Sequence, residues 1–218
     1  IKNKNVRNWT AKELMTQVQN LDFKVIDKLK DYTVTEKADG ERYLLYIKDN
    51  DIFTIDRSLN INFLNNSNNN LNKNSNNNSN NNLNNNLNNN SNNNSNNNNS
   101  NIKRNISPLT DNLYLFDIEK IQTKTKILYL VFDSIIIDGK DVSYLEFYKR
   151  YQMLNNIKFK NNFKLKKHFY EKEKIFEKCK KVYLETKYPY KIDGLIFTPL
   201  HVQYRADVYK WKPPELQT

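Results

Sequence analysis

The sequence KADGER at residues 37–42 has residue types that suit chemistry at a phosphate. It lies between two short strand-like runs, residues 32–36 and 43–47. A lysine at such a turn can attack a nucleotide phosphate once its amine is neutral, and neighbouring cations and desolvation favour the neutral form. Cations that could do this, and could also stabilise phosphate charge in the transition state, are Arg42, Lys210 and Lys212. Because Lys-x-Asp-Gly also occurs in ordinary surface turns, the motif needs support from elsewhere in the chain.

Further along the chain, acids and lysines stand at the ends of predicted strands. Glu119 ends an otherwise apolar strand, and Asp193 directly precedes a glycine at the start of another. A carboxylate in the position of Asp193 could hold a hard cation such as Mg²⁺. Lys210 and Lys212 are two residues apart, so both ammonium groups share one face of a strand, and Trp211 lies on the other. Each feature alone is more often structural, and only their combination favours a site.

An arginine and a phenylalanine could also take part in this chemistry, whereas the two histidines of the chain are not expected to. Arg57 ends a predicted hairpin strand, and Phe132, on a strand, could stack on a base, although an isolated strand phenylalanine is more often part of a core. His168 and His201 are expected to be ordinary surface or core histidines.

Composition limits the class of protein. A chain of 218 residues can bury a core, and it fits one domain with an insertion. Its net charge of +11 suits a polyanionic partner, although many lysines could also simply solvate the surface. One cysteine, Cys179, excludes a disulfide framework and fits a reducing compartment. No apolar run is long enough to span a membrane, so no membrane partner is expected. Because the chain starts at Ile1, it is expected to be part of a longer protein.

The predicted elements indicate an α+β fold with antiparallel sheets, because strands cluster with a few helices and no regular βαβ alternation appears. Capping-box patterns at residues 10–13 and 143–146 predict helix starts, and residues 169–181 are expected to be helical with Ile175, Phe176 and Cys179 on the buried face. Strands are predicted at residues 32–36, 42–47, 52–57, 113–119, 127–137, 182–186, 192–198 and 208–211, with a hairpin joining the second and third and a turn at residues 138–140.

An Asn-rich tract at residues 65–105 interrupts this pattern. It has no hydrophobic period and cannot offset its ordering entropy by burial, so it is predicted to be a disordered insertion. Motifs on both sides belong together, and residues 1–218 are therefore interpreted as one interrupted domain.

The order of the motifs resembles the nucleotidyltransferase domain of mRNA capping enzymes, in the covalent nucleotidyltransferase superfamily shared with ATP-dependent DNA and RNA ligases. The resemblance runs from Tyr32 to Pro214 apart from the tract. The matching pieces are EKADGER at residues 36–42, DIE at 117–119, VFD at 131–133, DGLIF at 193–197 and KWKP at 210–213. The fold implied is that of the ligase and capping enzyme catalytic domain, with antiparallel sheets flanking a nucleotide cleft.

The resemblance also implies a reaction. Lys37 would attack the α-phosphate of GTP, expel pyrophosphate and form a lysyl-N-GMP intermediate, and the GMP would then pass to the 5′-diphosphate end of an RNA. By the same resemblance, Arg42 and Arg57 would contact phosphate and ribose, and Lys210 and Lys212 would bind the α-phosphate. Phe132 would stack on the guanine, and Lys167 would recognise its O6. Asp193 with Glu119 would place a divalent metal (Mg²⁺ or Mn²⁺), and Glu119 would contact the ribose or a metal-bound water.

Two alternatives remain open. One is an ATP-dependent polynucleotide ligase domain, and the other is a catalytically silent RNA-binding domain. Ligases usually carry Glu where this chain has Asp193, and the tryptophan of KWKPP is closer to capping enzymes. The resemblance further implies an OB-fold domain after Thr218, RNA polymerase or other capping subunits as partners, and a viral-type multifunctional relative. The location would be the nucleus for a cellular enzyme and the host cytoplasm or virion for a viral one.

Overall fold

The computed structural model describes residues 14–49, 51–64, 113–170 and 174–216. The chain divides into two compact units, and every described residue belongs to the unit formed by Ile1–Asn65 with Arg104–Thr218. The second unit, Asn66–Lys103, lies outside the described residues, and so do the helix start predicted at residues 10–13 and the tract at 65–105. Their predictions therefore stay predictions.

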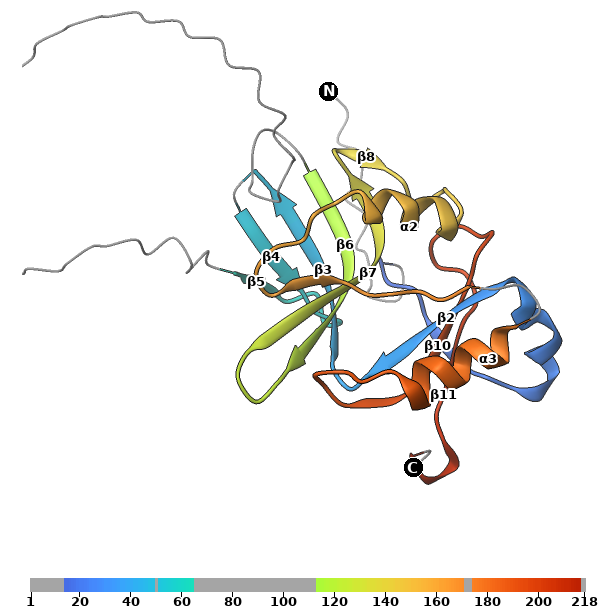
Figure 1. Cartoon of the computed structure of the whole chain (residues 1–218). Helices are drawn as coiled ribbons and strands as arrows, with labels where there is room; N and C mark the ends of the chain where they lie inside the picture. Colours follow the sequence, from blue (N-terminus) through green and yellow to red (C-terminus); the bar gives the residue numbers. More distant parts are fainter. Residues whose placement is uncertain (1–13, 50, 65–112, 171–173, 217–218) are drawn as a thin grey trace, which may run out of the picture. The chain divides into compact units, whose positions relative to one another are not determined.

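The first sheet contains the strand that carries Lys37. Its order is β1-β11-β10-β2, with β1 at Val18–Asn20, β11 at Val208–Trp211, β10 at Ile192–Pro199 and β2 at Tyr32–Ala38. β10 is antiparallel to both β2 and β11, whereas β1 pairs with β11 in parallel. Segments from both ends of the chain therefore meet in one sheet (Figure 1).

The second sheet follows the path β5-β4-β3-β6-β7-β8, and β9 pairs with β7 in parallel. The strands are β3 (Glu41–Lys48), β4 (Asp51–Ile55), β5 (Ile61–Phe63), β6 (Leu113–Gln122), β7 (Ile127–Ile137), β8 (Lys140–Asp141) and β9 (Phe163–Leu165). Only two residues separate β2 from β3, so the turn after Lys37 carries the chain directly from the first sheet to the second. This makes Lys37 a neighbour of both sheets.

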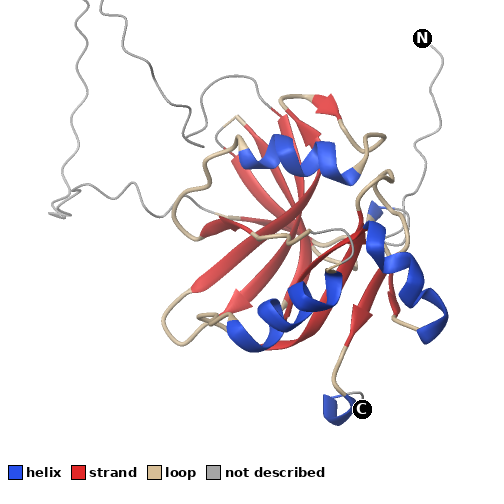
Figure 2. Cartoon of the chain, turned by 45° about the vertical axis from the view of Figure 1, so that its right-hand side comes forward, coloured by secondary structure: helices blue, strands red, loops and turns tan. Residues whose placement is uncertain are grey.

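Helical segments cover the sheets on their outer sides (Figure 2). They are the 3₁₀ helix η1 (Phe23–Asp31), α2 (Phe147–Asn155), α3 (Ile175–Lys180), the π-helical turn η2 (Lys181–Glu185) and the short 3₁₀ helix η3 (Pro214–Leu216). Within the described residues, no helix is long and apolar enough to cross a membrane.

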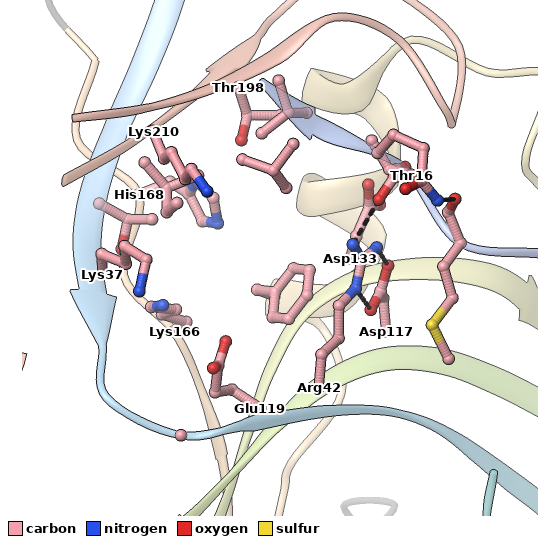
Figure 3. Close-up of a pocket in the computed structure, with 18 of the residues that line it drawn as sticks. Thr16, Lys37, Arg42, Asp117, Glu119, Asp133, Lys166, His168, Thr198 and Lys210 are labelled. Atoms are coloured by element: carbon pink, nitrogen blue, oxygen red, sulfur yellow. Dashed lines mark hydrogen bonds and ion pairs between the residues drawn. The ribbon is translucent and has the colours of Figure 1, made fainter. Parts of the chain in front are cut away.

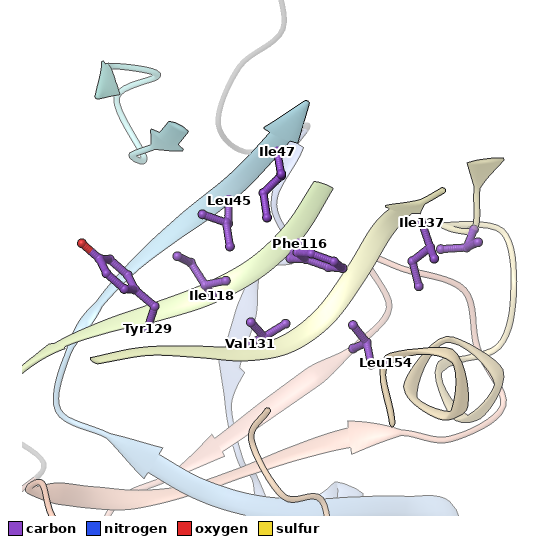
Figure 4. Packing of buried hydrophobic residues seen from close by; sticks show 9 residues of the cluster. Leu45, Ile47, Phe116, Ile118, Tyr129, Val131, Ile137 and Leu154 are labelled. Carbon is purple, nitrogen blue, oxygen red and sulfur yellow. The ribbon is translucent and has the colours of Figure 1, made fainter. Parts of the chain in front are cut away.

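Each sheet has its own hydrophobic core. Leu45, Phe116, Ile118 and Val131 of the second sheet pack with Leu154 of α2, and all are fully or almost fully buried (Figure 4). Beside the first sheet, strand residues pack against η1, α3 and η2 in a second cluster, whose buried members are Leu29, Tyr32, Val34, Ile175, Val182, Leu195, Phe197 and Tyr209. Burying such side chains contributes about 1.5–3 kcal/mol each. A third cluster joins the two sheets, because Ala38 of β2 packs with Ile121 of β6 and with Leu128 and Leu130 of β7.

The α+β prediction with antiparallel sheets is confirmed, and so are the β3–β4 hairpin, β6, β7, β10, β11 and the turn after β7. In that turn Asp138 and Gly139 adopt positive φ angles of 51° and 72°, which a glycine accepts without strain. His201, predicted to be an ordinary surface or core histidine, is exposed on the surface.

Four local predictions were wrong. Residues 182–185 are helical rather than extended, because η2 continues α3 and buries Val182 against the first sheet, and only Thr186 has an extended backbone. Phe176 is 61% exposed, so it does not belong to the buried face of α3. Helix α2 starts at Phe147 with Glu146 as its N-cap, and no side chain caps it, so the predicted start at residue 143 was too early. The predicted long helix is only Ile175–Lys180, since Phe169 instead pairs with Val34 as an isolated bridge.

Candidate active site

A cavity of about 550 Å³ contains most of the residues that the sequence singled out. Figure 3 shows Lys37, Lys166 and Glu119 projecting into it on one side, with Arg42 and Asp117 paired on the other. The predicted residues among its lining are Lys37, Arg42, Arg57, Glu119, Phe132, Lys210 and Lys212. These residues come from strands of both sheets, except Lys212, which directly follows β11, and Arg57, which lies two residues after β4.

Lys37 and Lys212 hold one carboxylate between them. The Lys37 Nζ donates to Asp193 Oδ1 at 2.7 Å, and the Lys212 Nζ lies 2.8 Å from Asp193 Oδ2. Burial raises the pKa of Asp193, but the hydrogen bonds from the two lysines outweigh it and bring the pKa below its ordinary value. Both lysine side chains remain partly exposed, at 23% and 31%. The amine is therefore held beside a carboxylate and within reach of solvent.

Two glycines allow this close approach. At Gly194, beside Asp193, a Cβ would stand 2.0 Å from the Trp211 backbone oxygen, and the residue has a φ of +153°. Only glycine therefore lets β10 lie so close to β11 at this point. The register of β10 against β2 also shifts between Ile192 and Leu195, which is where Asp193 is located. At Gly40 a Cβ would meet the Lys120 backbone oxygen at 2.6 Å, so the turn after Lys37 also needs a glycine.

Arg42 lines the cavity, but a buried network holds its guanidinium group. Its Nε donates to Asp117 Oδ1 at 2.7 Å, its Nη2 donates to Asp117 Oδ2, and its Nη1 donates to the Thr16 carbonyl. The Tyr204 hydroxyl donates to Asp117 Oδ2 at 2.7 Å. The Arg42 side chain is only 8% exposed and that of Asp117 is not exposed. Arg42 is thus a fixed part of the wall.

A second arginine and aspartate pair lies beside the first. Arg150 of α2 donates to Asp133 of β7 through Nε and Nη2, both at 2.8 Å. Burial raises the pKa of Asp133, and the bonds from Arg150 oppose that shift. Asp133 and Asp117 are direct partners across β6 and β7, so each buried carboxylate needs its own arginine.

Phe132 lies in the cavity, partly buried and outside the hydrophobic clusters. Two cations flank its ring: the Arg42 Cζ is 5.5 Å and the Lys166 Nζ 5.8 Å from the ring centroid. Such distances are typical of cation–π contacts. The ring is therefore held by its neighbours and also accessible from the cavity.

The structure places Lys166 in the cavity, not Lys167. Lys166 is buried, and its Nζ lies 3.8 Å from Oε1 of the equally buried Glu36. Lys167 is exposed and does not line the cavity, and its carbonyl accepts a hydrogen bond from the Thr35 hydroxyl. The sequence indicated a lysine here, but two adjacent lysines cannot be told apart without knowing which way the strand faces.

Glu119 is the carboxylate on the opposite side of the cavity from Thr198 and Lys210 (Figure 3). Burial raises its pKa above the ordinary value, and the charges of Lys166, Lys37 and Arg42 offset part of that shift. A carboxylate in this setting can accept a hydrogen bond or share a cation, because positive charges surround it.

His168, predicted to be an ordinary surface or core histidine, is buried and also lines the cavity. Within the described part of the chain neither of its ring nitrogens has a hydrogen-bond partner, and both are buried. Phe147 and Tyr151 pack on the ring, with centroids 4.8 and 4.9 Å away. Burial and the nearby Lys166 charge lower the pKa of His168 to about 3, so the imidazole is neutral at physiological pH.

Sequence reasoning missed several residues of the site. They are Glu36, Asp117, Asp133, Arg150, Lys166 and Tyr204. An acid in an apolar strand, as at Asp117 and Asp133, was a usable signal, because a buried carboxylate needs a partner. Their partners could not be found in this way, since Tyr204 is 87 positions from Asp117.

The described residues contain no group of three or more His, Cys, Asp or Glu side chains that could hold a metal by themselves. Asp193 already has both oxygens in ion pairs with lysines. Mg²⁺ usually binds through one or two carboxylates together with substrate phosphates.

Comparison with solved structures identifies the class of fold. A Lig E DNA ligase is similar with a TM-score of 0.51 at 16% identity, over 91% of this chain and 68% of that one. The ligase domain of LigD from M. tuberculosis has a TM-score of 0.50 at 11% identity, and mycobacterial DNA ligase D complexed with ATP and MES has 0.51 at 11%. Each comparison covers 91% of this chain and 58% of the other. The fold is therefore the nucleotidyltransferase fold shared by DNA ligases and capping enzymes.

The family follows from the sequence model that matches. Residues 18–214 match the model of the mRNA capping enzyme catalytic domain, which is most of the chain. The chain belongs to this family. A search of curated proteins gave no match. The family and the fold support a covalent nucleotidyltransferase.

Proposed function

We propose that this chain is a GTP:RNA guanylyltransferase domain that transfers GMP through a covalent bond to Lys37. The observation that carries the proposal is the contact of both Lys37 and Lys212 with Asp193, beside a cavity that Phe132 and Lys166 also line. It brings together a nucleophile, cations for a phosphate and an aromatic ring for a base.

The chemistry begins with the amine. An ammonium group has no lone pair, so Lys37 must give up a proton before attack, and Asp193 Oδ1 at 2.7 Å is the nearest acceptor. The amine then forms a bond to the α-phosphorus, the bond to the β-phosphate oxygen breaks, and pyrophosphate leaves with the electron pair. The Nζ then loses a second proton, so that the nitrogen of the phosphoramidate is uncharged. Lys210 and Lys212 would stabilise the negative charge on the phosphate oxygens.

A divalent cation, Mg²⁺ or Mn²⁺, would add Lewis-acid stabilisation of the phosphates when bound. Glu119 and Asp193 are the carboxylates that would hold it. Lys37 and Lys212 would then have to release Asp193 in part, which partly exposed lysine pairs can do at small cost.

Preference for guanine would come from two other residues that line the cavity. Phe132 offers a ring face for stacking, and Lys166 offers an ammonium group fixed by Glu36. Guanine presents the acceptor O6 where adenine presents an amino group. A buried ammonium group is a donor only, so it suits O6 and disfavours the adenine amine. We therefore assign to Lys166 the role that the resemblance implied for Lys167.

The second half-reaction needs an acceptor. We propose the 5′-diphosphate end of an RNA, whose terminal phosphate oxygen would attack the lysyl-GMP phosphorus and release Lys37. The net charge of +11 favours such a polyanion.

The ligase alternative is supported by the similarity of the fold to DNA ligases. It differs in nucleotide and in acceptor. A direct test is to incubate the chain with GTP or ATP and Mg²⁺ or Mn²⁺ and to measure the intact mass. A mass gain of GMP with GTP, mapped to Lys37, supports the proposal. A gain of AMP with ATP and none with GTP would support the ligase reading, and Lys166→Met should reduce any preference for GTP.

A further inference from the structure

Tyr204 lies in the loop between β10 and β11, but its contacts belong to the second sheet and α2. Its backbone N–H donates to the Ser143 carbonyl at 2.9 Å. Its ring lies under Arg150, whose Cζ is 5.7 Å from the ring centroid. The same arginine donates to the Val202 carbonyl in this loop at 3.2 Å. Tyr204 is only 9% exposed, so these contacts fix its position.

An unbroken series of contacts leads from this hydroxyl to Phe132. The Tyr204 hydroxyl donates to Asp117 Oδ2 at 2.7 Å, and Asp117 accepts two further bonds from Arg42. The Arg42 guanidinium then lies over the ring of Phe132, with Cζ 5.5 Å from its centroid. Arg42, Asp117 and Phe132 all line the cavity.

The hydroxyl has a specific role in this series. Burial and the charge of Asp117 raise the pKa of Tyr204 far above its ordinary value, so it stays a donor at every working pH. Asp117 is fully buried and shares one oxygen between Tyr204 and Arg42. Without the hydroxyl, only Arg42 and any entering water would satisfy that oxygen, and the guanidinium group would be free to move toward it.

We propose that Tyr204 is a positioning residue for nucleotide binding, which acts through Asp117 and Arg42 to fix the Phe132 ring against which the base stacks. The inference rests on the proposed function in requiring that the cavity binds a nucleoside triphosphate and that its base stacks on Phe132. It assigns a role to the loop between β10 and β11 of the first sheet, because Tyr204 in this loop contacts Asp117 of the second sheet.

The test uses Tyr204→Phe in the full chain, with Tyr114→Phe as the matched control. The Tyr114 hydroxyl also donates to a carboxylate, that of Asp138, but it does not line the cavity. We expect Tyr204→Phe to raise the half-saturating nucleotide concentration for adduct formation roughly fivefold, with less than a twofold change in maximal rate. Tyr114→Phe should change neither value, and melting temperatures of both variants report any general loss of stability.

A double-mutant cycle separates positioning from a structural role. In a Phe132→Ala background the ring is absent, so Tyr204→Phe should then change the half-saturating concentration by less than twofold. A full fivefold effect in that background would overturn the proposal, and so would an equal effect of Tyr114→Phe.

Running the cycle with both GTP and ATP separates this proposal from the function. If only ATP forms an adduct, the guanylyltransferase assignment fails, and the cycle measured with ATP still decides the role of Tyr204. If the unmodified chain binds neither nucleotide, measured by equilibrium dialysis, both proposals fail.

Discussion

The cavity has two clusters built from the same kinds of group but with opposite physical character. At one end, Asp193 is shared by Lys37 and Lys212, whose side chains are 23% and 31% exposed. At the other, Asp117 is shared by Arg42 and Tyr204 and is not exposed at all. In both clusters each carboxylate oxygen contacts at least one neighbouring side chain.

The difference separates residues that must move from residues that must stay. A lysine ammonium is a point charge on a flexible stem, and partly exposed pairs contribute about 0–1 kcal/mol. An arginine binds a carboxylate as a rigid fork, and removing one partner of a buried pair costs about 3–5 kcal/mol. The proposed nucleophile, Lys37, could therefore leave Asp193 during the proposed reaction, while the wall formed by Arg42 and Asp117 would keep its shape.

The largest effect should come from the reactive cluster. Lys37→Ala removes the proposed nucleophile, and we expect at least a thousandfold loss of nucleotide adduct, measured by intact mass spectrometry. Lys37→Arg is the matched control, because it keeps the positive charge beside Asp193 but should also fail to react. Adduct formation in Lys37→Ala at the normal rate would show that another residue is the nucleophile.

The buried cluster should show its effect in stability. Asp117→Ala leaves the Arg42 guanidinium buried without its carboxylate, and we expect unfolding free energy to fall by about 3–5 kcal/mol in urea titrations. Asp138→Asn is the control, because asparagine tolerates the positive φ of this exposed turn and keeps an acceptor for Tyr114, and it should cost less than about 1 kcal/mol. A loss from Asp117→Ala as small as that of the control would mean that the network is not fixed.

His168 adds a third case, a buried polar group with no described partner. Its pKa is 6.5 when unperturbed and about 3 in the folded chain, so the unfolded state binds more protons. Stability is then fully present above pH 6.5 and falls as pH drops from 6.5 toward 3. Between pH 7 and pH 5 we expect this chain to lose about 2 kcal/mol more unfolding free energy than His168→Phe. Equal losses would show that the imidazole is not buried in its neutral form.

The smallest effect should follow from loosening the exposed end. Asp193→Asn keeps the shape and removes the charge, and both lysines can turn to solvent. We expect unfolding free energy to change by about 1 kcal/mol or less, well below the Asp117→Ala loss. Adduct formation measured on the same variant should nevertheless fall, because the proton acceptor beside Lys37 is weakened. A stability loss equal to that of Asp117→Ala would erase the distinction between the clusters.

Much of the fold could be predicted because its signals are local. β7 and β11 matched their predicted bounds, since alternating and β-branched runs specify strands directly. Residues 182–185 carry similar residues, yet packing beside α3 made them helical, because tertiary contacts override weak propensity. Helix α2 likewise begins four residues beyond its capping signal.

The sequence alone determined that Lys37, Asp193, Lys210 and Lys212 are candidates for one reaction, because short motifs preserve residue type and spacing. Only the tertiary structure decided that Asp193 pairs with Lys37 and Lys212, that Lys166 and not Lys167 enters the cavity, and that Tyr204 reaches Asp117. The physical reason is that sheet pairing and burial bring together side chains whose separation along the chain carries no information about their distance in space.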